Sequence, residues 1–211
     1  MKALNIPVGI SNFEKIRNNG FYYVDKTGLI EELLKTEAEV TLITRPRRFG
    51  KTLGMSMLES FFDIRKNSRK LFEGLEIARQ SELCSKWMNQ CPTVSVSFRQ
   101  VDGLNFTSAY DMLTMVFADL YNKHLYLLED SHVTEFQKKT FTNIAHGCGS
   151  EKEVKSSLVL LTTMMQQHYG KAVVLLIDEY DVPVAKANAH GYYNEMLDVM
   201  KGLLQALKDN Q

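Results

Sequence analysis

The sequence predicts an α/β fold with a mainly parallel sheet and a helical insert. Three runs rich in β-forming residues stand at 40–44, 93–98 and 173–177, and the segments between them repeat apolar residues at helical spacing. The last run is continuously apolar, which is typical of a strand buried on both faces of a parallel sheet. At 211 residues the chain has the length of one domain. Its predicted parts are an amino-terminal arm and helix at 1–36 and a core at 37–211, with the helical insert at 104–169.

The first chemical motif follows the run at 40–44 and precedes a helical pattern. Gly50, Lys51 and Thr52 match the end of the Walker A pattern G-x-x-x-x-G-K-[ST], while Arg45 occupies the position of its first glycine. A glycine lets the backbone approach a phosphate, the lysine supplies a mobile cation, and the threonine hydroxyl is a ligand for Mg²⁺. The alternative is a basic turn on a solvated surface. We predict a phosphate-binding loop, whose remaining members are Arg45, Pro46, Arg47, Arg48 and Phe49.

The second motif stands directly after the apolar run at 173–177. Asp178 follows that run, where a Walker B aspartate would hold Mg²⁺, and Glu179 comes next, where a carboxylate can orient or deprotonate a water. The alternative is a polar turn before the next helix. Because both motifs occur in the usual order on predicted strands, we favour a P-loop nucleoside triphosphatase fold, a three-layer sandwich.

Five segments together resemble one protein family. The segments are RPRRFGKT at 45–52, IDEYDVP at 177–183, FYYVDKTGLIEELL at 21–34, LFEGLEI at 71–77 and PTVSVSF at 92–98. They are similar to the AAA-ATPase-like family of bacteria and archaea, in which an arginine usually replaces the first Walker glycine. The resemblance implies ATP binding by the loop at 45–52 and magnesium-dependent chemistry at Asp178 and Glu179. Members often carry a PD-(D/E)XK nuclease-like domain after the ATPase, so an attached or associated nuclease-like effector is implied as well.

Two features of the arm have more than one interpretation. Asp25 and Thr27 can each cap a helix predicted at 29–34. Tyr22 or Tyr23 stacks on the nucleotide base in one interpretation and packs the arm on the core in the other, and the general role of aromatic residues in cores favours packing.

Further helices are predicted by apolar spacing and by capping signals. Ser150 and Glu153 form the pattern of a capping box, Gly170 ends the helix before the run at 173–177, and Asp181 either caps the following helix or adds an acid to the site. The predicted helical segments are one running on from Thr52, then 81–90, Thr107 to about Leu128, 131–145 and 188–207.

Composition excludes several classes of protein. Lys+Arg 25 balances Asp+Glu 25, so no overall positive charge indicates nucleic-acid binding. Cys84, Cys91 and Cys148 lack the spacing of a zinc site or a disulfide framework, and neither a signal peptide nor an apolar run of membrane-spanning length is found. We therefore predict a cytoplasmic protein with no membrane span.

The sequence ends about one helix after Asp178, at Gln211. ATPases with an additional central strand place it after the Walker B strand, together with a polar sensor, so we expect a fold that is incomplete at its carboxyl end. The leading hypothesis is magnesium-dependent ATP hydrolysis, with Lys51 and Glu179 catalytic and with Thr52 and Asp178 holding Mg²⁺. The alternatives are a weakly hydrolysing nucleotide-dependent switch and a protein-interaction scaffold.

Overall fold

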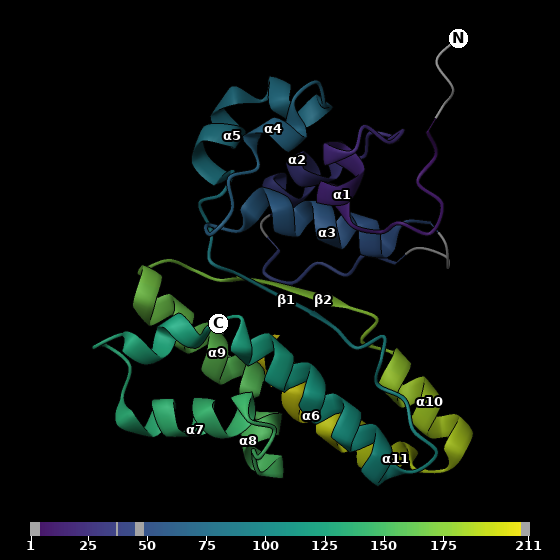
Figure 1. Cartoon of the computed structure of the whole chain (residues 1–211), viewed down its shortest axis with the longest axis vertical. Coiled ribbons are helices and arrows are strands. Elements are labelled where there is room, and N and C mark those ends of the chain that lie inside the picture. Colours follow the sequence, from purple (N-terminus) through teal and green to yellow (C-terminus); the bar gives the residue numbers. More distant parts are fainter. Residues whose placement is uncertain (1–4, 37, 45–48, 208–211) are drawn as a thin grey trace. The chain divides into compact units, whose positions relative to one another are not determined.

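The computed structural model describes residues 5–36, 38–44 and 49–207. Arg45, Pro46, Arg47 and Arg48 of the predicted loop lie outside the described residues. The chain divides into two compact units, Met1–Thr93 and Val94–Gln211, and we describe each unit by itself (Figure 1). Within the described ranges, every helix falls short of the length and apolar character that a membrane crossing needs.

The first unit consists of short helices around an aromatic core. Its elements are α1 (Phe13–Asn18), α2 (Gly28–Lys35), α3 (Lys51–Phe62), α4 (Arg69–Phe72), the 3-10 helix η1 (Glu76–Arg79) and α5 (Ser81–Trp87). Phe13, Phe61 and Phe72 are fully buried. The ring of Phe72 lies 5.0 Å from that of Phe13 and 5.4 Å from that of Phe61, which are distances at which aromatic pairs stabilise a core. This core fixes α3, the helix that begins at the predicted phosphate loop.

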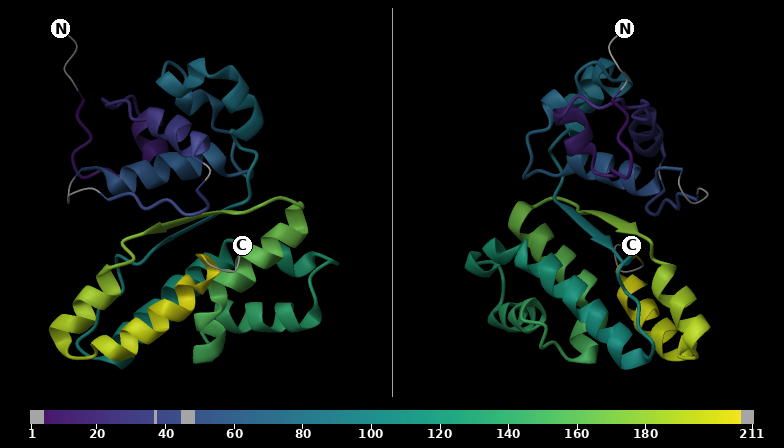
Figure 2. Two further views of the ribbon diagram at one scale, coloured as in Figure 1. Left: turned by 180° about the vertical axis from the view of Figure 1, so that it is seen from behind. Right: turned by 45° about the vertical axis from the view of Figure 1, so that its right-hand side comes forward.

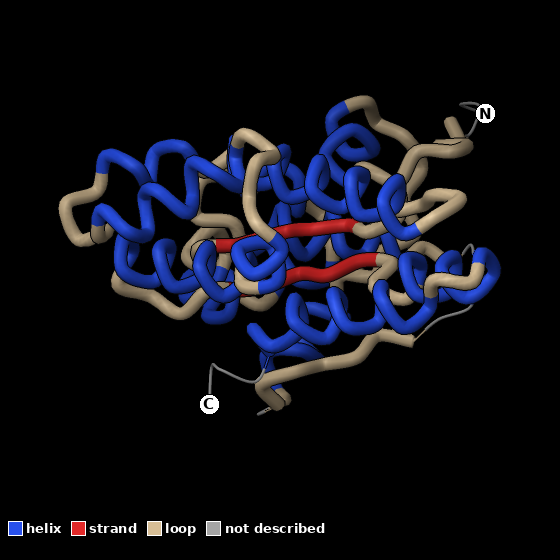
Figure 3. Tube along the Cα trace, turned by 90° about the horizontal axis from the view of Figure 1, so that it is seen from below, coloured by secondary structure: helices blue, strands red, loops and turns tan. Residues whose placement is uncertain are grey.

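The second unit is a two-stranded parallel sheet covered by helices, which confirms an α/β chain with a small parallel sheet. Figure 3 shows the two strands side by side. Most of its helices lie between the two strands in the sequence. The elements are β1 (Thr93–Ser97), α6 (Phe106–Asn122), the 3-10 helix η2 (Leu125–Glu129), α7 (Glu135–Ala145), α8 (Glu151–Lys155), α9 (Ser157–Tyr169), β2 (Val174–Asp178), α10 (Val182–His190), α11 (Tyr193–Leu203) and the 3-10 helix η3 (Leu204–Leu207).

The core of the second unit lies between its sheet and its helices, which Figure 2 shows together on one face of the strands. Val94 and Val96 of β1 are buried, as the alternation of that strand predicts. Phe98, just after β1, packs on Phe117 of α6, with ring centroids 6.1 Å apart. β2 is less deeply buried than expected, because Leu176 is its only buried apolar residue and the others are partly exposed. The prediction of a strand buried on both faces was wrong.

The predicted strand at 40–44 is the main correction to the sheet. These residues form neither a helix nor a paired strand, and Val40 and Leu42 are 53% and 64% exposed. A strand needs a neighbour that supplies backbone hydrogen bonds, and no such bond to 40–44 occurs among the described residues. β-forming residues alone were therefore insufficient to make this segment a strand.

Helix boundaries agree with the sequence where a capping residue was identified correctly. The Ser150 and Glu153 capping box begins α8, and Gly170 ends α9 in the left-handed conformation, as predicted. α6 starts two residues earlier than a Thr107 cap predicts, at Phe106, because Asn105 and Ser108 form its capping box. The helix predicted at 188–207 begins later than expected, at Tyr193, because Gly191 adopts φ 83° and separates α10 from α11.

A short polar cluster joins η2 to the end of α9. Asp130 Oδ1 accepts from the backbone N–H of His132, at 2.8 Å, and Oδ2 contacts the imidazole of His168. These hydrogen bonds, that of the His132 backbone first, lower the pKa of Asp130 to about 2. The cluster fixes the end of α9 from which the chain passes into β2.

Candidate functional site

The predicted phosphate loop ends at a well-formed helix start. Gly50 is the N-terminal cap of α3 and adopts φ 79°, a left-handed conformation that favours glycine. Its carbonyl accepts the N–H of Gly54 at 2.9 Å, and α3 begins at Lys51. Gly50 has no side chain with which to cap this helix, and no side-chain capping bond to it occurs among the described residues. Its first N–H groups and its positive end are therefore suited to an anion.

Lys51 and Thr52 both lie in the first turn of α3 and are partly exposed. The buried face of the helix begins further along, at Met57, so neither side chain is needed for the core. Phe49 is 60% exposed. The structure therefore leaves the Walker-like residues that it describes at the surface, on a helix that the aromatic core holds in place.

Asp178 is the last residue of β2, and its side chain is unusual. It is 8% exposed, and its Oδ2 atom is fully buried without a hydrogen-bond partner among the described residues. Its backbone carbonyl accepts the N–H of Phe98 at 3.0 Å, which fixes the end of β2 beside the end of β1. A buried carboxylate oxygen without a donor is costly, and coordination to a cation would compensate for it.

Glu179 has the second unusual feature, because it is a residue other than glycine with φ 54°. Such a conformation costs roughly 1–2 kcal/mol in an L-amino acid. Its carbonyl accepts the N–H of Val182 at 3.1 Å, which closes the turn into α10. Strained backbone of this kind is concentrated at functional sites, where it directs a side chain. This strain could not be recognised from the residue type.

Asp181 occupies the N-cap position of α10, but its side chain makes no capping hydrogen bond. The two interpretations of this residue therefore remain open. Tyr23, by contrast, packs on Phe13 at 5.3 Å and donates its hydroxyl to Met57 Sδ at 3.4 Å, which supports the packing interpretation for this tyrosine. Burial raises its pKa to about 12.

The donor set fits magnesium better than a transition metal. The described residues contain no group of three or more His, Cys, Asp or Glu side chains arranged to hold a metal. Mg²⁺ does not require such a cage, since it keeps several waters and binds one or two protein oxygens together with substrate phosphates. The unpartnered oxygen of Asp178, in the second unit, is a donor of this kind.

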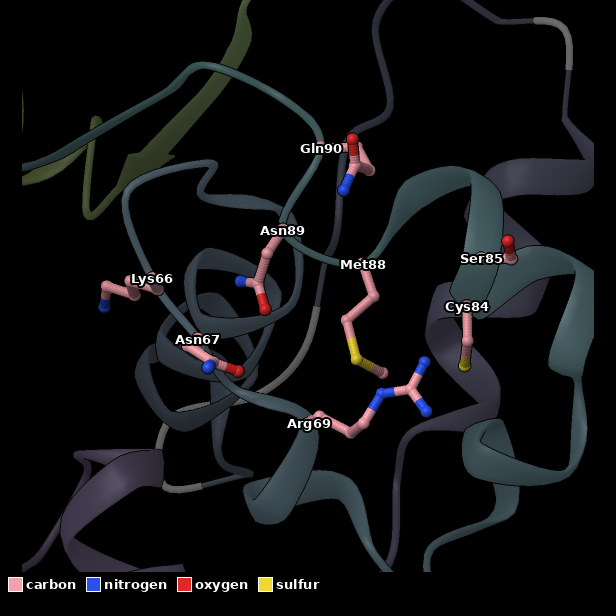
Figure 4. Close-up of a pocket in the computed structure, with 8 residues that line it drawn as sticks. All are labelled: Lys66, Asn67, Arg69, Cys84, Ser85, Met88, Asn89 and Gln90. Carbon is pink, nitrogen blue, oxygen red and sulfur yellow. The ribbon is translucent and has the colours of Figure 1, made fainter.

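A pocket in the first unit is a less suitable site. This pocket has a volume of about 470 Å³ and is lined by Lys66, Asn67, Arg69, Cys84, Ser85, Met88, Asn89 and Gln90 (Figure 4). Lys66 is already paired with Glu14 and Glu59, at 2.7 and 3.0 Å. Arg65 lies outside the phosphate loop and could have contacted a phosphate from there. Its guanidinium is instead paired with the carboxylate of Asp63 at 2.9 Å. Among the predicted site residues that the structure describes, none lines the pocket.

One basic residue near the loop was missed in the sequence. Lys26 Nζ lies 3.4 Å from the carbonyl oxygen of Phe49, although the two residues are 23 positions apart. The sequence predicts only a helix-capping role for its neighbours Asp25 and Thr27, and Thr27 stands at the N-cap of α2 without a side-chain capping bond. The signal that could have found Lys26 is the run VDKTG, a lysine between two turn-forming residues.

The described elements define an α/β chain with a small parallel sheet, an uncapped glycine-initiated helix and acids at the end of a strand. The chain belongs to the AAA-ATPase-like family, described as predicted AAA-ATPases, which it matches over residues 7–211. Membership of this family implies nucleotide binding. The chain is also 26% identical over 212 residues to a protein of Azotobacter chroococcum mcd 1, described as an uncharacterized protein in the vnfD 5′ region. The match covers 100% of this chain and 36% of that relative. No solved structure matches the chain.

Proposed function

We propose that this chain binds ATP and hydrolyses its γ-phosphate in a magnesium-dependent reaction. Phosphate binding is assigned to the loop, and Lys51 supplies the mobile cation. Thr52 and Asp178 are assigned to Mg²⁺, and Glu179 to the attacking water. The remaining loop residues in this assignment are Arg45, Pro46, Arg47, Arg48, Phe49 and Gly50. The proposal is supported by the family, by the Walker-like sequence and by the start of α3.

The buried oxygen of Asp178 is the observation that carries the proposal. A carboxylate at the end of a strand normally turns to water or accepts hydrogen bonds from the next turn. Asp178 is 8% exposed and leaves Oδ2 without a partner in the described part of the chain. An unpaired buried oxygen lowers the stability of the fold, so its presence is best explained by a ligand such as a cation.

The chain's own residues supply positioning and proton transfer. The Lys51 ammonium and the first amides of α3 stabilise negative charge on the phosphate oxygens. Glu179 holds a water and accepts its proton as the water oxygen bonds to the γ-phosphorus. The bond from that phosphorus to the bridging oxygen breaks, and ADP and phosphate leave. Bound Mg²⁺ would neutralise charge on the β- and γ-phosphate oxygens.

The finer fold and the biological context belong to the same proposal. We assign the P-loop three-layer sandwich to this chain. The amino-terminal arm and helix at 1–36, the core at 37–211 and the helical insert at 104–169 stay predictions. Coupling of hydrolysis to an attached or associated nuclease-like effector, and a cytoplasmic location, also stay predictions.

Replacing Asp178 with asparagine tests the proposal, because it should lower ATP turnover without lowering the stability of the fold. We expect magnesium-dependent ATP turnover to fall at least about a hundredfold, because the amide is a poor substitute for a charged ligand. The free energy of unfolding without metal and nucleotide should not fall, and a rise of about 1 kcal/mol is expected, because a buried unpaired charge is removed. Phosphate release with magnesium or with EDTA, and urea unfolding, are the measurements.

Asp119→Asn is the matched control, since Asp119 is exposed on α6. It should change neither turnover nor stability appreciably. If Asp178→Asn keeps full magnesium-dependent turnover, the metal assignment is wrong. If the substitution instead destabilises the metal-free chain by several kcal/mol, Asp178 has a structural role in place of the one proposed.

A further inference from the structure

Lys26 is held on a rigid turn in the first unit. Asp25 Oδ1 accepts from the backbone N–H and the hydroxyl of Thr27, at 2.9 and 2.7 Å, and Asp25 Oδ2 accepts from the N–H of Glu76 at 2.7 Å. The Thr27 hydroxyl, which is fully buried, also accepts from the N–H of Ile77 at 3.2 Å. Partial burial opposes ionisation of Asp25, but these hydrogen bonds outweigh it and lower its pKa. The residues on both sides of Lys26 are thus fixed.

From this turn the Lys26 side chain reaches the last residues of the phosphate loop. Its Nζ donates to the carbonyl of Phe49 at 3.4 Å and lies 3.6 Å from the position that a Cβ atom on Gly50 would occupy. Both residues directly precede Lys51. The ammonium of Lys26 therefore lies beside the N-terminus of α3, in the same unit as Lys51 and Thr52.

The charge of Lys26 is not balanced in the described residues. Lys35 pairs with Glu31 and Lys66 pairs with Glu14 and Glu59, whereas no ion pair of Lys26 with a carboxylate occurs in the ranges that the structure describes. A carbonyl satisfies one of the three N–H donors of an ammonium and leaves its charge uncompensated. In addition, a cation at the positive end of a helix is unfavourable, and Lys26 and Lys51 place two cations there.

We propose that Lys26 is a second phosphate-binding cation, which contacts the polyphosphate of the nucleotide from outside the Walker-like loop. The inference rests on the proposed function, because it concerns the same nucleotide. An anion at the start of α3 would pair with Lys26 and Lys51 together and remove their unfavourable interaction with the helix dipole. The fixed turn at Asp25 and Thr27 reduces the side-chain entropy that Lys26 would lose on binding.

Three substitutions of Lys26 separate its charge from its hydrogen bond. Lys26→Gln removes the charge but keeps a donor for the Phe49 carbonyl, Lys26→Met removes both, and Lys26→Arg keeps the charge. Displacement of labelled ATP by unlabelled ATP, ADP and AMP, at two salt concentrations, measures the effect. Lys70→Gln is the control, because Lys70 is an exposed lysine of the same unit on α4.

We expect Lys26→Gln and Lys26→Met to weaken ATP and ADP binding about tenfold, the usual effect of losing one charged hydrogen bond. AMP binding should change little, Lys26→Arg should retain most of the affinity, and the salt dependence of ATP binding should become shallower in the uncharged variants. The unliganded Lys26→Gln chain should unfold at the same urea concentration as the parent or a higher one.

Parent-like ATP affinity in Lys26→Gln would overturn the inference, because the charge of Lys26 would then be unnecessary. A loss in Lys26→Met alone would assign the effect to the hydrogen bond with Phe49. An equal loss in Lys70→Gln would overturn the inference as well, since the effect would be general to surface charge. Either result leaves the proposed function intact as long as Lys51→Ala weakens binding. Failure of the parent chain to bind ATP would overturn both.

Discussion

Replacing Glu179 with glutamine is expected to lower ATP turnover by a factor of about 100 to 10,000 while leaving ATP bound. This range is typical for loss of a general base, because the amide can still hold the water but cannot accept its proton. Glutamine meets the same backbone requirement at φ 54° as glutamate does, so the turn into α10 should persist. Single-turnover phosphate release measures the chemical step, and retention of labelled ATP on the protein measures binding.

Glu195→Gln provides the control, since Glu195 is an exposed residue of α11. It should hydrolyse ATP at the parent rate. Turnover in Glu179→Gln equal to that of the parent would remove Glu179 from the catalytic assignment. A parent chain that binds ATP tightly with almost no turnover would instead favour a nucleotide-dependent regulatory switch.

Replacing Gly103 with alanine is expected to destabilise the second unit by about 1–3 kcal/mol, the usual range for overpacking. A Cβ atom at this position would lie 2.5 Å from the backbone nitrogen of Ala109 and 2.5 Å from Ser108 Oγ. Both atoms belong to the first turn of α6, which the Asn105 and Ser108 capping box holds. The Gly103 carbonyl also accepts the hydroxyl of Tyr192 at 2.7 Å, so the loop cannot easily move away.

Gly54→Ala is the matched control for this prediction. Gly54 lies within α3, and a Cβ atom there would meet nothing within 4 Å. The substitution should stabilise the chain by up to about 1 kcal/mol, because alanine is the better helix former. Urea unfolding of the two variants should therefore shift in opposite directions. A Gly103→Ala chain that unfolds like the parent would show that this loop adapts freely.

The parts of the fold that were predictable depend on local signals. The start of α3 follows from the Walker-like pattern, in which a helix begins after the glycine. The end of α9 follows from Gly170, because a left-handed glycine commonly ends a helix. The residues 40–44 have the same β-forming composition as true strands, but pairing is a tertiary property that composition does not contain. Gly191 was overlooked because the apolar spacing on its two sides resembles one continuous helix.

The residue types of the candidate site come from sequence patterns and stay predictions, whereas its physical state depends on the fold. The Walker-like pattern identified Lys51 and Thr52, and the apolar run identified Asp178 and Glu179. The buried oxygen of Asp178 and the left-handed backbone of Glu179 depend on how the chain packs around them, and no residue pattern indicates either. Lys26 was missed for a related reason, since its contact with Phe49 joins segments 23 positions apart.

Magnesium-dependent ATP binding tests the account most directly. Calorimetric titration of ATP should be carried out with and without Mg²⁺, on the parent chain and on Lys51→Ala. We predict that magnesium strengthens ATP binding by the parent and that Lys51→Ala loses most of this affinity, because the mobile phosphate-binding cation is removed. Equal ATP affinity in the two chains, or no ATP binding by the parent, would contradict the account and would favour a scaffold that does not use nucleotide.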